Sequence, residues 1–482
     1  MKQEQAPFWE ALVAYARQRV VPFHTPGHKL RPGAFSRLQE ELGTGVFALD
    51  PSDQVEAPEL EHDFVRALDR AQELAAQLFG ARRTLFIVNG TTGGVHFLLL
   101  PATGDVLIPR FSHQSVYSAL VLSQGRAVYL PTAYDPDWLI PLPPVVSAVQ
   151  RALQEMRPQA LIVTHPTYYG TVSDLEAIGR LAKEDNVLLF VDEAHGGHFL
   201  FSPELPKTGL QCGADAVVQS THKTLGSFTQ TSMLHSNNDL WFSKAVQAQQ
   251  VLQTTSPSFV FLGALDEVRR VLAAQGEELV GRALELAQWC RHRLAEIEHV
   301  ELLPAHLQAD PTKIVFSLRQ LGLTGIEVER ILRVDYNIQV ELSDYYTVLA
   351  LITLGDTSET VDKLVHAVWD LAARRTHLGG QPLPRYRLDF PELPPAALSL
   401  REAFFQDKEL VPLEQAAGRV SGAFLTPYPP GVPLIVPGEV FTKAIVEHAR
   451  WCAGIGWYTR GLMAGQKVLV LKDNGGRCRT VR

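Results

Sequence analysis

The stretch that decides the fold is VLLFVDEAHGGH at residues 187–198, taken together with AVVQSTHK at residues 216–223. Each begins with a short, mostly apolar run rich in β-branched residues, which is typical of a strand buried on both faces of a sheet. The first run ends at Asp192, and the second leads into Ser220, His222 and Lys223. Since parallel α/β sheets bind ligands at the carboxyl ends of their strands, the two stretches predict a ligand site at that edge.

The rest of the chain extends this arrangement. TLFIVNG, DVLIPR, AVYLP and ALIVTH are further strand candidates, and helical patterns alternate with them. Such alternation predicts an α/β domain whose sheet is largely parallel and buried on both faces. Long helical patterns from about Leu262 to Ile297 precede KIVFSLR, NIQVEL and YTVLALITLG, which predict the strands of a smaller α/β unit.

We expect five parts along the chain. Residues 5–20 have helical spacing, and so does an amphipathic run from about Glu59 to a stop at Gly80. The stretch 376–395 is rich in Pro and Gly, which predicts a linker. The expected parts are an N-terminal helical arm (1–22), a large ligand-binding domain (23–270), a small α/β domain (271–375), the linker (376–395) and a C-terminal α+β domain (396–482).

A lysine and a carboxylate at neighbouring strand ends suit pyridoxal 5'-phosphate. Lys223 can form a Schiff base with the cofactor aldehyde. Asp192 can keep the pyridine nitrogen protonated, so that the ring withdraws electrons. For these two residues taken alone, the alternative is a structural salt bridge at a strand end.

Residues at other predicted strand ends fit the same cofactor. Thr91 and Thr92 precede an apolar helix, and a helix N-terminus offers unpaired N–H groups to a phosphate. An ordinary N-capped turn is the alternative for the threonines. Ser220 can reach the same phosphate, because it lies three residues before Lys223. His113 follows the strand DVLIP, so its imidazole can stack on the pyridine ring or orient the substrate carboxylate.

Six ordered blocks carry a family resemblance. They are HTPGHK (24–29), NGTTGG (89–94), DEAHGGH (192–198), STHK (220–223), DPTK (310–313) and PYPPGVPLIVPGE (427–439). Together they resemble the bacterial ornithine/lysine/arginine decarboxylases, a branch of the aspartate-aminotransferase-like fold, from about residue 20 to about residue 450. The resemblance implies a cofactor-binding large domain, a smaller α/β domain and a C-terminal decarboxylase domain.

The resemblance also implies which side chains contact the cofactor. They are Thr91, Thr92, His113, Asp192, Ala194, His195, Ser220, His222 and Lys223. The expected catalytic residues among them are Lys223, His113, Asp192 and His222. Ala194 must stay small if the ring packs over it, and His222 would lie near the phosphate or the leaving carboxylate. His195 is a departure, because larger family members often carry an aromatic residue there.

Substrate recognition is expected to depend on a carboxylate. Glu341 matches a family glutamate that faces the distal cation of the substrate, and a solvated strand-end carboxylate is the alternative. Asp344 is a weaker candidate, and Thr312 and Lys313 of DPTK are expected to be structural. The HTPGHK block is expected to line the cofactor mouth or to take part in a dimer contact.

The predicted function is decarboxylation of arginine, lysine or ornithine to a diamine or agmatine and carbon dioxide, within polyamine metabolism. All three substrates carry a distal cation, so charge does not separate them. One alternative is an aminotransferase or lyase of the same fold, for which Arg319 is the nearest arginine that could bind an α-carboxylate. A second alternative is an inactive regulatory homologue, which the retained site residues disfavour.

Composition limits the kinds of partner and location that we expect for the chain. The net charge is -8 and no basic tract occurs, so nucleic acid is not an expected partner. No apolar stretch approaches the ~18 residues that span a bilayer. The four cysteines have no metal-ligand spacing, so we expect reduced thiols, no metal and a cytoplasmic protein. The fold implies at least a homodimer. Few residues precede His24, so we do not expect the N-terminal wing of larger members or their ring-shaped decamers.

Overall fold

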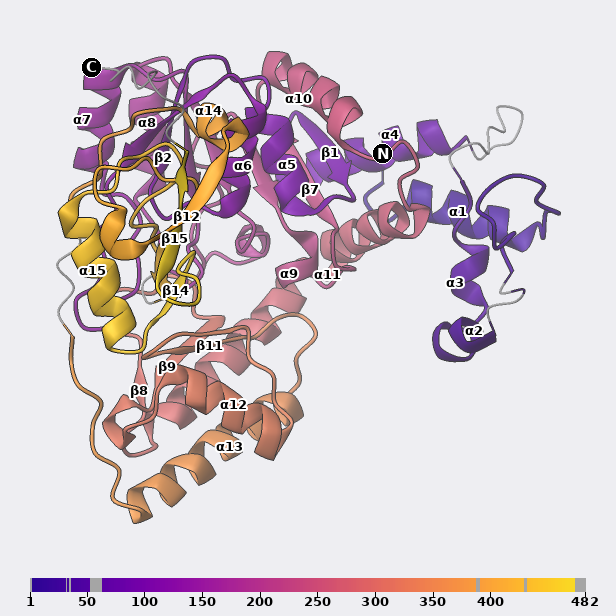
Figure 1. Cartoon of the computed structure of the whole chain (residues 1–482). Helices are drawn as coiled ribbons and strands as arrows, with labels where there is room; N and C mark the ends of the chain where they lie inside the picture. Colours follow the sequence, from indigo (N-terminus) through magenta and orange to yellow (C-terminus); the bar gives the residue numbers. More distant parts are fainter. Residues whose placement is uncertain are drawn as a thin grey trace. The chain divides into compact units, whose positions relative to one another are not determined.

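A computed structural model describes residues 2–31, 33, 36–52, 63–386, 391–428 and 431–472 of the 482. The chain divides into two compact units, each built from separate stretches. The first unit comprises Met1–Pro101 and Leu188–Gly281, and the second comprises Ala102–Val187 and Arg282–Arg482. Figure 1 follows the elements of both units in the colours of the sequence.

The first unit contains the two stretches that opened the sequence analysis. Its strands pair in the order β1 (Arg83–Ile87), β7 (Ser232–Ser236), β6 (Ala216–Gln219) and β5 (Leu188–Asp192). β5 and β6 are parallel, with Asp192 opposite Val218, whereas β7 is antiparallel to both of its neighbours. The predicted strands β1, β5 and β6 are therefore confirmed. The sequence did not predict β7.

Helices surround these strands. They are α4 (Phe64–Phe79), α5 (Gly90–Leu99), the 3-10 turn Phe199–Phe201, α9 (Thr221–Thr224), α10 (Asp239–Leu252) and α11 (Phe259–Ala295). α4 ends at Gly80, whose φ of 69° lies in the left-handed region that glycine tolerates, as predicted. Its N-cap is Asp63, and the earlier start predicted at Glu59 lies outside the described residues.

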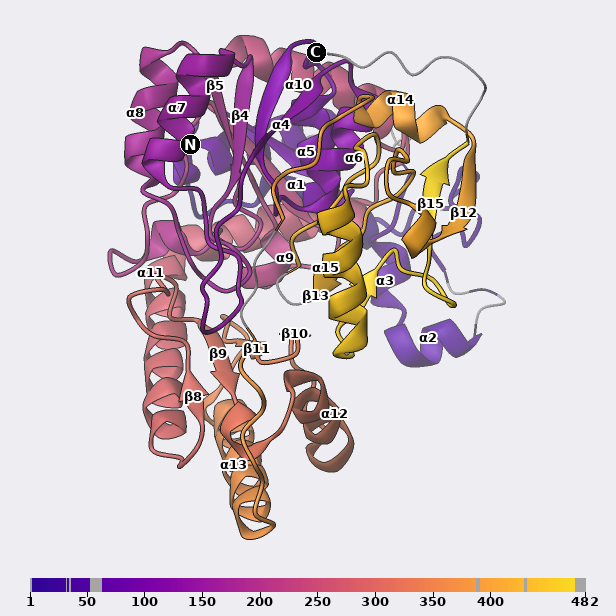
Figure 2. The ribbon, with the colours of Figure 1, turned by 60° about the vertical axis from the view of Figure 1, so that its left-hand side comes forward.

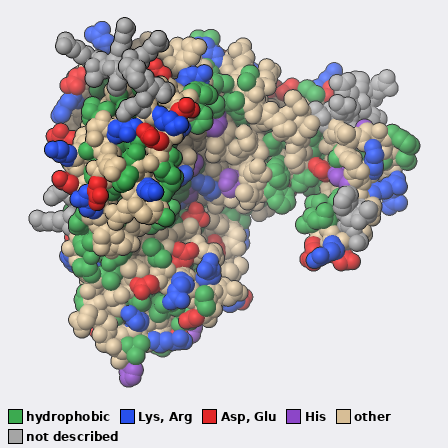
Figure 3. Space-filling view, in the orientation of Figure 1, with side chains coloured by type: hydrophobic (Ala, Val, Ile, Leu, Met, Phe, Trp, Pro, Cys, Tyr) green, Lys and Arg blue, Asp and Glu red, His purple; other side chains and the backbone are tan. Residues whose placement is uncertain are grey.

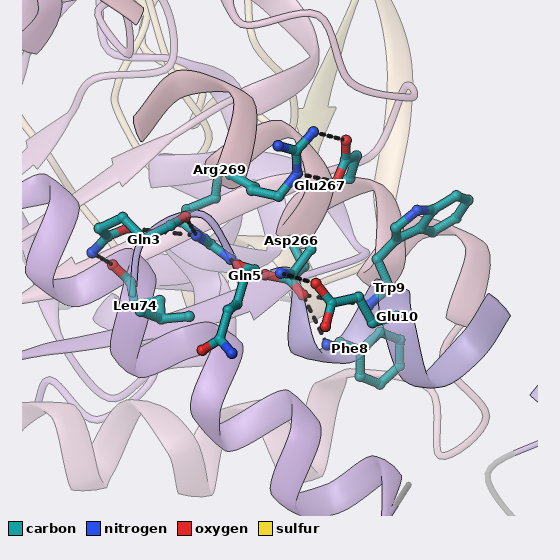
Figure 4. Close-up of polar contacts among 11 residues, drawn as sticks. Gln3, Gln5, Phe8, Trp9, Glu10, Leu74, Asp266, Glu267 and Arg269 are labelled. Carbon is teal, nitrogen blue, oxygen red and sulfur yellow. Dashed lines mark hydrogen bonds and ion pairs between the residues drawn. The ribbon is translucent and has the colours of Figure 1, made fainter. Parts of the chain in front are cut away.

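The N-terminal arm contains α1 (Pro7–Arg17), α2 (Ser36–Leu42) and α3 (Gly45–Ala48). Two side chains of α11, Asp266 and Arg269, hold the start of α1, as Figure 4 shows. Asp266 Oδ2 accepts hydrogen bonds from the backbone N–H groups of Phe8 (2.8 Å) and Trp9 (3.3 Å). Because α1 has no side-chain cap of its own, a carboxylate from a distant helix supplies that cap.

The second unit contains three parallel strands in the order β4 (Ala160–Thr164), β2 (Asp105–Pro109) and β3 (Arg126–Leu130). Helices α6 (Gln114–Leu122), α7 (Val146–Met156) and α8 (Leu175–Glu184) alternate with them. All three strands were predicted. With β5 and β6 of the first unit, they confirm a mixed α/β fold whose strands in these segments are mainly parallel.

The small α/β part of the second unit has an antiparallel sheet in the order β10 (Leu342–Ser343), β11 (Val348–Leu351), β9 (Lys313–Ser317) and β8 (Glu301–Leu302). The 3-10 turn Arg319–Leu321, α12 (Gly325–Tyr336) and α13 (Ser358–His377) complete it. The strand predicted at NIQVEL is wrong except for Leu342. Asn337 ends α12 in the left-handed conformation, and the backbone first bonds to β11 at Glu341, whose N–H donates to the carbonyl oxygen of Leu349 at 3.0 Å.

The C-terminal part contains α14 (Leu400–Phe405), β12 (Lys408–Pro412), the 3-10 turn Leu413–Gln415, β13 (Thr426–Tyr428), α15 (Lys443–Gly454), β14 (Tyr458–Arg460) and β15 (Lys467–Leu471). β12 pairs antiparallel with β15, visible side by side in Figure 2, and β13 pairs with β14. The predicted linker begins inside α13. Its residues Leu383 and Pro384 are anchored by hydrogen bonds with Arg319 and Tyr346, and residues 387–390 lie outside the described part.

Within the described residues, no helix is long and apolar enough to cross a membrane. On the face that Figure 3 shows, Lys and Arg side chains are interspersed with Asp and Glu side chains. That face therefore has no continuous basic field of the kind that binds a nucleic-acid backbone.

Candidate active site

The predicted acid lies at the end of β5. Asp192 is buried, and its Oδ1 accepts a hydrogen bond from the backbone N–H of Ala194 at 3.2 Å. Ala194 is also buried, so a small side chain occupies this position in the turn after β5. The parallel register sets Asp192 beside Val218 of β6, and β6 leads directly to the lysine. The stretches 187–198 and 216–223 are thus connected through the pairing of β5 with β6.

Glu193, which the sequence analysis did not single out, is fully buried next to Asp192. Its carboxylate accepts hydrogen bonds from the Gln219 side-chain amide (2.6 Å) and the Gly209 backbone N–H (2.8 Å). Burial raises the pKa of Glu193 to about 8. Through these hydrogen bonds, Glu193 ties the end of β5 to Gln219 of β6 and to the segment at Gly209.

The predicted lysine lies on α9, the short helix that follows β6. Lys223 Nζ is 2.9 Å from His195 Nε2, and His195 is buried in the turn after Asp192. The residue at which this chain departs from larger family members therefore contacts the predicted covalent lysine. His222, the neighbour of Lys223, donates its Nδ1–H to the carbonyl oxygen of Thr231 at 2.8 Å.

Three hydroxyl groups meet at the start of α5. Thr91 Oγ1 lies 2.6 Å from Ser220 Oγ and 2.9 Å from Ser232 Oγ, and all three residues are buried. Ser232 in turn donates to the carbonyl oxygen of Gln219 at 2.7 Å. Thr92 is exposed, so the two predicted threonines have different surroundings. Ser232 was missed because the strand that carries it, β7, was not predicted.

These residues fit a phosphate ester. A Cβ atom on Gly94 would lie 2.4 Å from Val218 Cγ1, so α5 approaches β6 as closely as only glycine allows. The helix N-terminus then presents N–H groups beside the hydroxyl cluster. Nearby in sequence, the buried hydroxyls of Thr221, Thr224 and Ser227 have no hydrogen-bond partner among the described residues. Donors without partners are what an anionic cofactor group would use.

His113 belongs to the second unit, where it is the N-cap residue of α6. Its Nδ1 accepts the backbone N–H of Ser115 (3.2 Å) and lies 2.8 Å from the Ser115 hydroxyl, and the side chain is exposed. The ring lines a cavity of about 340 Å³. Six aromatic side chains line it as well, namely Phe111, Tyr117, Tyr168, Tyr169, Phe424 and Tyr428, together with polar residues that include Asp344 and Arg460.

The two predicted substrate carboxylates lie in different environments. Asp344 is buried, and its oxygens accept hydrogen bonds from Tyr346 N, Thr347 N, Thr347 Oγ1 and Tyr169 Oη at 2.7–2.9 Å. All four donors come from the chain itself, and Asp344 also lines the cavity beside His113. Glu341 is exposed in the single chain, which is the environment of the stated alternative, a solvated carboxylate. Its contact with the substrate remains a prediction.

The contacts of the DPTK and HTPGHK blocks lie within the single chain, and the predicted role of HTPGHK at the cofactor mouth or a dimer contact stays a prediction. Asp310 Oδ1 accepts the hydroxyl of Thr312 at 2.6 Å, and Lys313 is fully buried, in line with the structural role expected of DPTK. In HTPGHK, Lys29 Nζ donates to the carbonyl oxygen of His24 at 2.7 Å, and His28 Nε2 lies 3.1 Å from Asp50 Oδ2. No group of three or more His, Cys, Asp or Glu side chains among the described residues could hold a metal ion.

The structure thus places seven predicted residues close to one another in the sheet-end segments of the first unit. They are Thr91, Thr92, Asp192, Ala194, His195, Ser220 and Lys223, with His222 on the same helix as the lysine. His113, Glu341 and Asp344 belong to the second unit.

Comparison with known proteins defines the class. The model of the Orn/Lys/Arg decarboxylase major domain matches residues 6–308, and that of the C-terminal domain matches residues 390–455. The chain is 37% identical to the arginine decarboxylase of Bacillus anthracis over 93% of each chain. It is 36% identical to the arginine decarboxylase of Bacillus subtilis, over 93% of this chain and 94% of the other.

A solved structure, lysine decarboxylase A from Pseudomonas aeruginosa, superposes with a TM-score of 0.81 at 22% identity, over 97% of this chain and 80% of that one. This likeness confirms the fold. The site and fold together are those of an enzyme that decarboxylates basic amino acids. The chain belongs to the Orn/Lys/Arg decarboxylase family, as the six sequence blocks predicted.

Proposed function

We propose that this chain decarboxylates arginine with pyridoxal 5'-phosphate as cofactor, and that Lys223 is the residue that binds the cofactor covalently. The observation that carries the proposal is a set of residues in the first unit: a buried acid at the end of β5, a half-buried lysine after β6 and a buried hydroxyl cluster at the start of α5. The family and its fold imply this cofactor.

Each residue has a stated task. Thr91, Thr92 and Ser220 would bind the phosphate group together with the N-terminal N–H groups of α5. Asp192 would hold a proton on the pyridine nitrogen, since the N–H of Ala194 keeps its carboxylate in place at the strand end. When bound, the cofactor takes up the electron pair that the departing carbon dioxide leaves behind.

Arginine is favoured over lysine and ornithine by the relatives. Those named arginine decarboxylases are 36–38% identical and match over nine-tenths of this chain. A lysine decarboxylase of Pseudomonas aeruginosa is 24% identical. Arg319 disfavours the aminotransferase alternative, because its Nε donates to Glu301 at 2.5 Å and its guanidinium lies 5.1 Å from the Trp138 ring centroid. It is already engaged and is not a ready ligand for an α-carboxylate.

We further propose that the active enzyme is at least a homodimer in the cytoplasm. His113 would stack on the cofactor ring, and His222 would lie near its phosphate. Glu341 is exposed in the single chain, so its proposed contact with the substrate's distal cation needs burial by a second copy. Exposed apolar residues of the arm, Val21 and Phe23, flank the HTPGHK block and are suited to such a contact.

A product assay tests the proposal. Purified protein supplied with the cofactor should release carbon dioxide from arginine and form agmatine at a higher kcat/KM than it forms diamines from lysine or ornithine. Release from lysine or ornithine at an equal or higher kcat/KM would overturn the substrate assignment. Formation of an oxo acid with retention of the carboxylate would overturn decarboxylation itself.

A further inference from the structure

The contact between Lys223 and His195 is built into the backbone of the first unit. The turn that carries His195 is closed by a hydrogen bond from Gly196 N to Glu193 O at 3.0 Å. A Cβ atom on Gly197 would lie 3.0 Å from Leu225 Cδ1, so the turn also packs against the segment that follows the lysine. The approach of His195 Nε2 to Lys223 Nζ at 2.9 Å therefore has support from both sides.

The chemistry of the two groups fixes the direction of this hydrogen bond. A lysine ammonium group has three donors and no acceptor, so it can bind only a ring nitrogen that carries a lone pair. A second positive charge at this distance would be repelled, which favours a neutral imidazole. The pair therefore holds the proton mainly on Lys223, with His195 Nε2 as the acceptor.

We propose that His195 is a positioning residue for Lys223, whose Nε2 accepts a hydrogen bond from the ε-ammonium group and holds the amine in place for the cofactor aldehyde. The inference rests on the proposed function, because it takes Lys223 to be the covalent lysine. In the attachment step the ammonium would release one proton, its nitrogen would form a double bond to the aldehyde carbon in place of the C=O bond, and the aldehyde oxygen would leave as water with the two remaining hydrogens of the nitrogen.

Removing the acceptor has two consequences of opposite sense. A half-buried ammonium that loses its hydrogen bond becomes easier to deprotonate, so more of the amine is the nucleophilic neutral form at a given pH. The four-carbon stem of lysine is flexible, so a neutral amine that is no longer held meets the aldehyde less often in a productive geometry. A purely structural role would not produce this combination.

Other titratable groups lie on the elements that carry this contact. They are Asp192 and Glu193 at the end of β5, His198 on the turn and His222 on α9, and all four are unchanged in the His195 variants. His198 is the matched control, because it lies on the same turn and is buried to the same degree as His195.

The test uses the full-length apoenzyme and two readouts. In the first, Lys223 is acylated by acetic anhydride between pH 6 and 10 and measured in its peptide by mass spectrometry, which reports the midpoint pH without the cofactor. In the second, pyridoxal phosphate is added at a pH where acylation has reached its plateau. Borohydride is then added after different times, and the amount of covalently trapped cofactor gives the rate of attachment.

His195→Leu should lower the acylation midpoint by about one pH unit. It should also slow attachment of the cofactor by about 10-fold. His195→Gln, whose side-chain oxygen can accept the hydrogen bond, should return both values toward those of the wild type, and His198→Leu should change neither.

A midpoint that is unchanged or raised in His195→Leu would overturn the inference, as would Gln and Leu variants that behave alike. His195→Gln keeps the comparison possible if the leucine variant fails to fold, since a Gln variant of unaltered midpoint supports the acceptor role and one with a lowered midpoint opposes it. If acylation behaves as expected but borohydride labels a different lysine, the contact stands and the proposed function of Lys223 fails.

Discussion

Replacement of Asp266 by alanine should destabilise the first unit strongly, because this carboxylate is at the centre of a buried network. The side chains of Asp266 and Arg269 are both 0% exposed and lie 2.6 Å apart. The same carboxylate caps α1 through Phe8 and Trp9, and Arg269 also donates to the backbone carbonyls of Gln3 and Gln5. Figure 4 shows these contacts around the start of the arm.

The loss of unfolding free energy in each variant follows from the buried groups that lose their partners. Asp266→Ala strands a buried guanidinium, which costs ~3–5 kcal/mol, and removes a helix cap worth ~1 kcal/mol. Because Arg269 keeps two carbonyl partners, we expect a total of about 4 kcal/mol. Arg269→Met should cost less, about 2–3 kcal/mol, since Asp266 keeps two N–H donors and burial already raises its pKa. The double variant should lose less than the sum of the two.

Urea denaturation and hydrogen exchange in residues 7–17 measure these losses. Glu267→Ala is the matched control, because Glu267 and Arg270 form an ion pair of the same spacing and length on the same helix with side chains that are about one-third exposed. It should cost no more than ~1 kcal/mol. A loss below ~1 kcal/mol for Asp266→Ala, or losses that simply add in the double variant, would refute the reasoning.

Three further predictions follow from single residues. Burial lowers the pKa of His235 to about 3, so the unfolded chain binds more protons between that value and the ordinary ~6.5, and stability is lost as the pH falls below ~6.5. His235→Gln should remove about 2 kcal/mol of that loss at pH 5 in acid denaturation, and an unchanged pH profile would contradict the assignment. Asp192→Asn should retain bound cofactor, measured by absorbance, while kcat falls by ~100-fold or more; turnover within a few-fold of wild type would mean that another group protonates the ring. Glu341→Gln should raise KM for arginine by ~30-fold in steady-state assays and leave KM for norleucine unchanged. An equal rise of KM for both amino acids would contradict the proposed substrate contact.

Periodicity predicted most of the first-unit and second-unit strands, because their residues are continuously apolar and stop at polar residues. It failed at β7, where Ser232, His235 and Ser236 are buried. Two of those side chains hydrogen-bond to residues distant in sequence, Ser232 to Thr91 at 2.9 Å and His235 Nδ1 to Thr84 at 2.8 Å, so no local pattern reveals the strand. At NIQVEL the alternation is that of a strand, but Asn337 in the left-handed conformation ends α12 and redirects the chain.

The candidate site was predictable where a residue type has a specific chemistry. An acid after one strand and a lysine after the next indicated Asp192 and Lys223, and the family blocks supported Thr91 and Ser220. Ser232 and Glu193 were not predictable, because their roles arise from hydrogen bonds across the sheet. The meaning of His195 also required coordinates, since only its distance from Lys223 shows what it contacts.

The most direct test of the central claim is to locate the covalent cofactor. Borohydride reduction of the enzyme loaded with pyridoxal phosphate, followed by peptide mass spectrometry, should find the reduced phosphopyridoxyl group on Lys223. Lys223→Ala should carry no such group and should release no carbon dioxide from arginine above background. A label on a different lysine, or covalent labelling that persists in Lys223→Ala, would contradict the account.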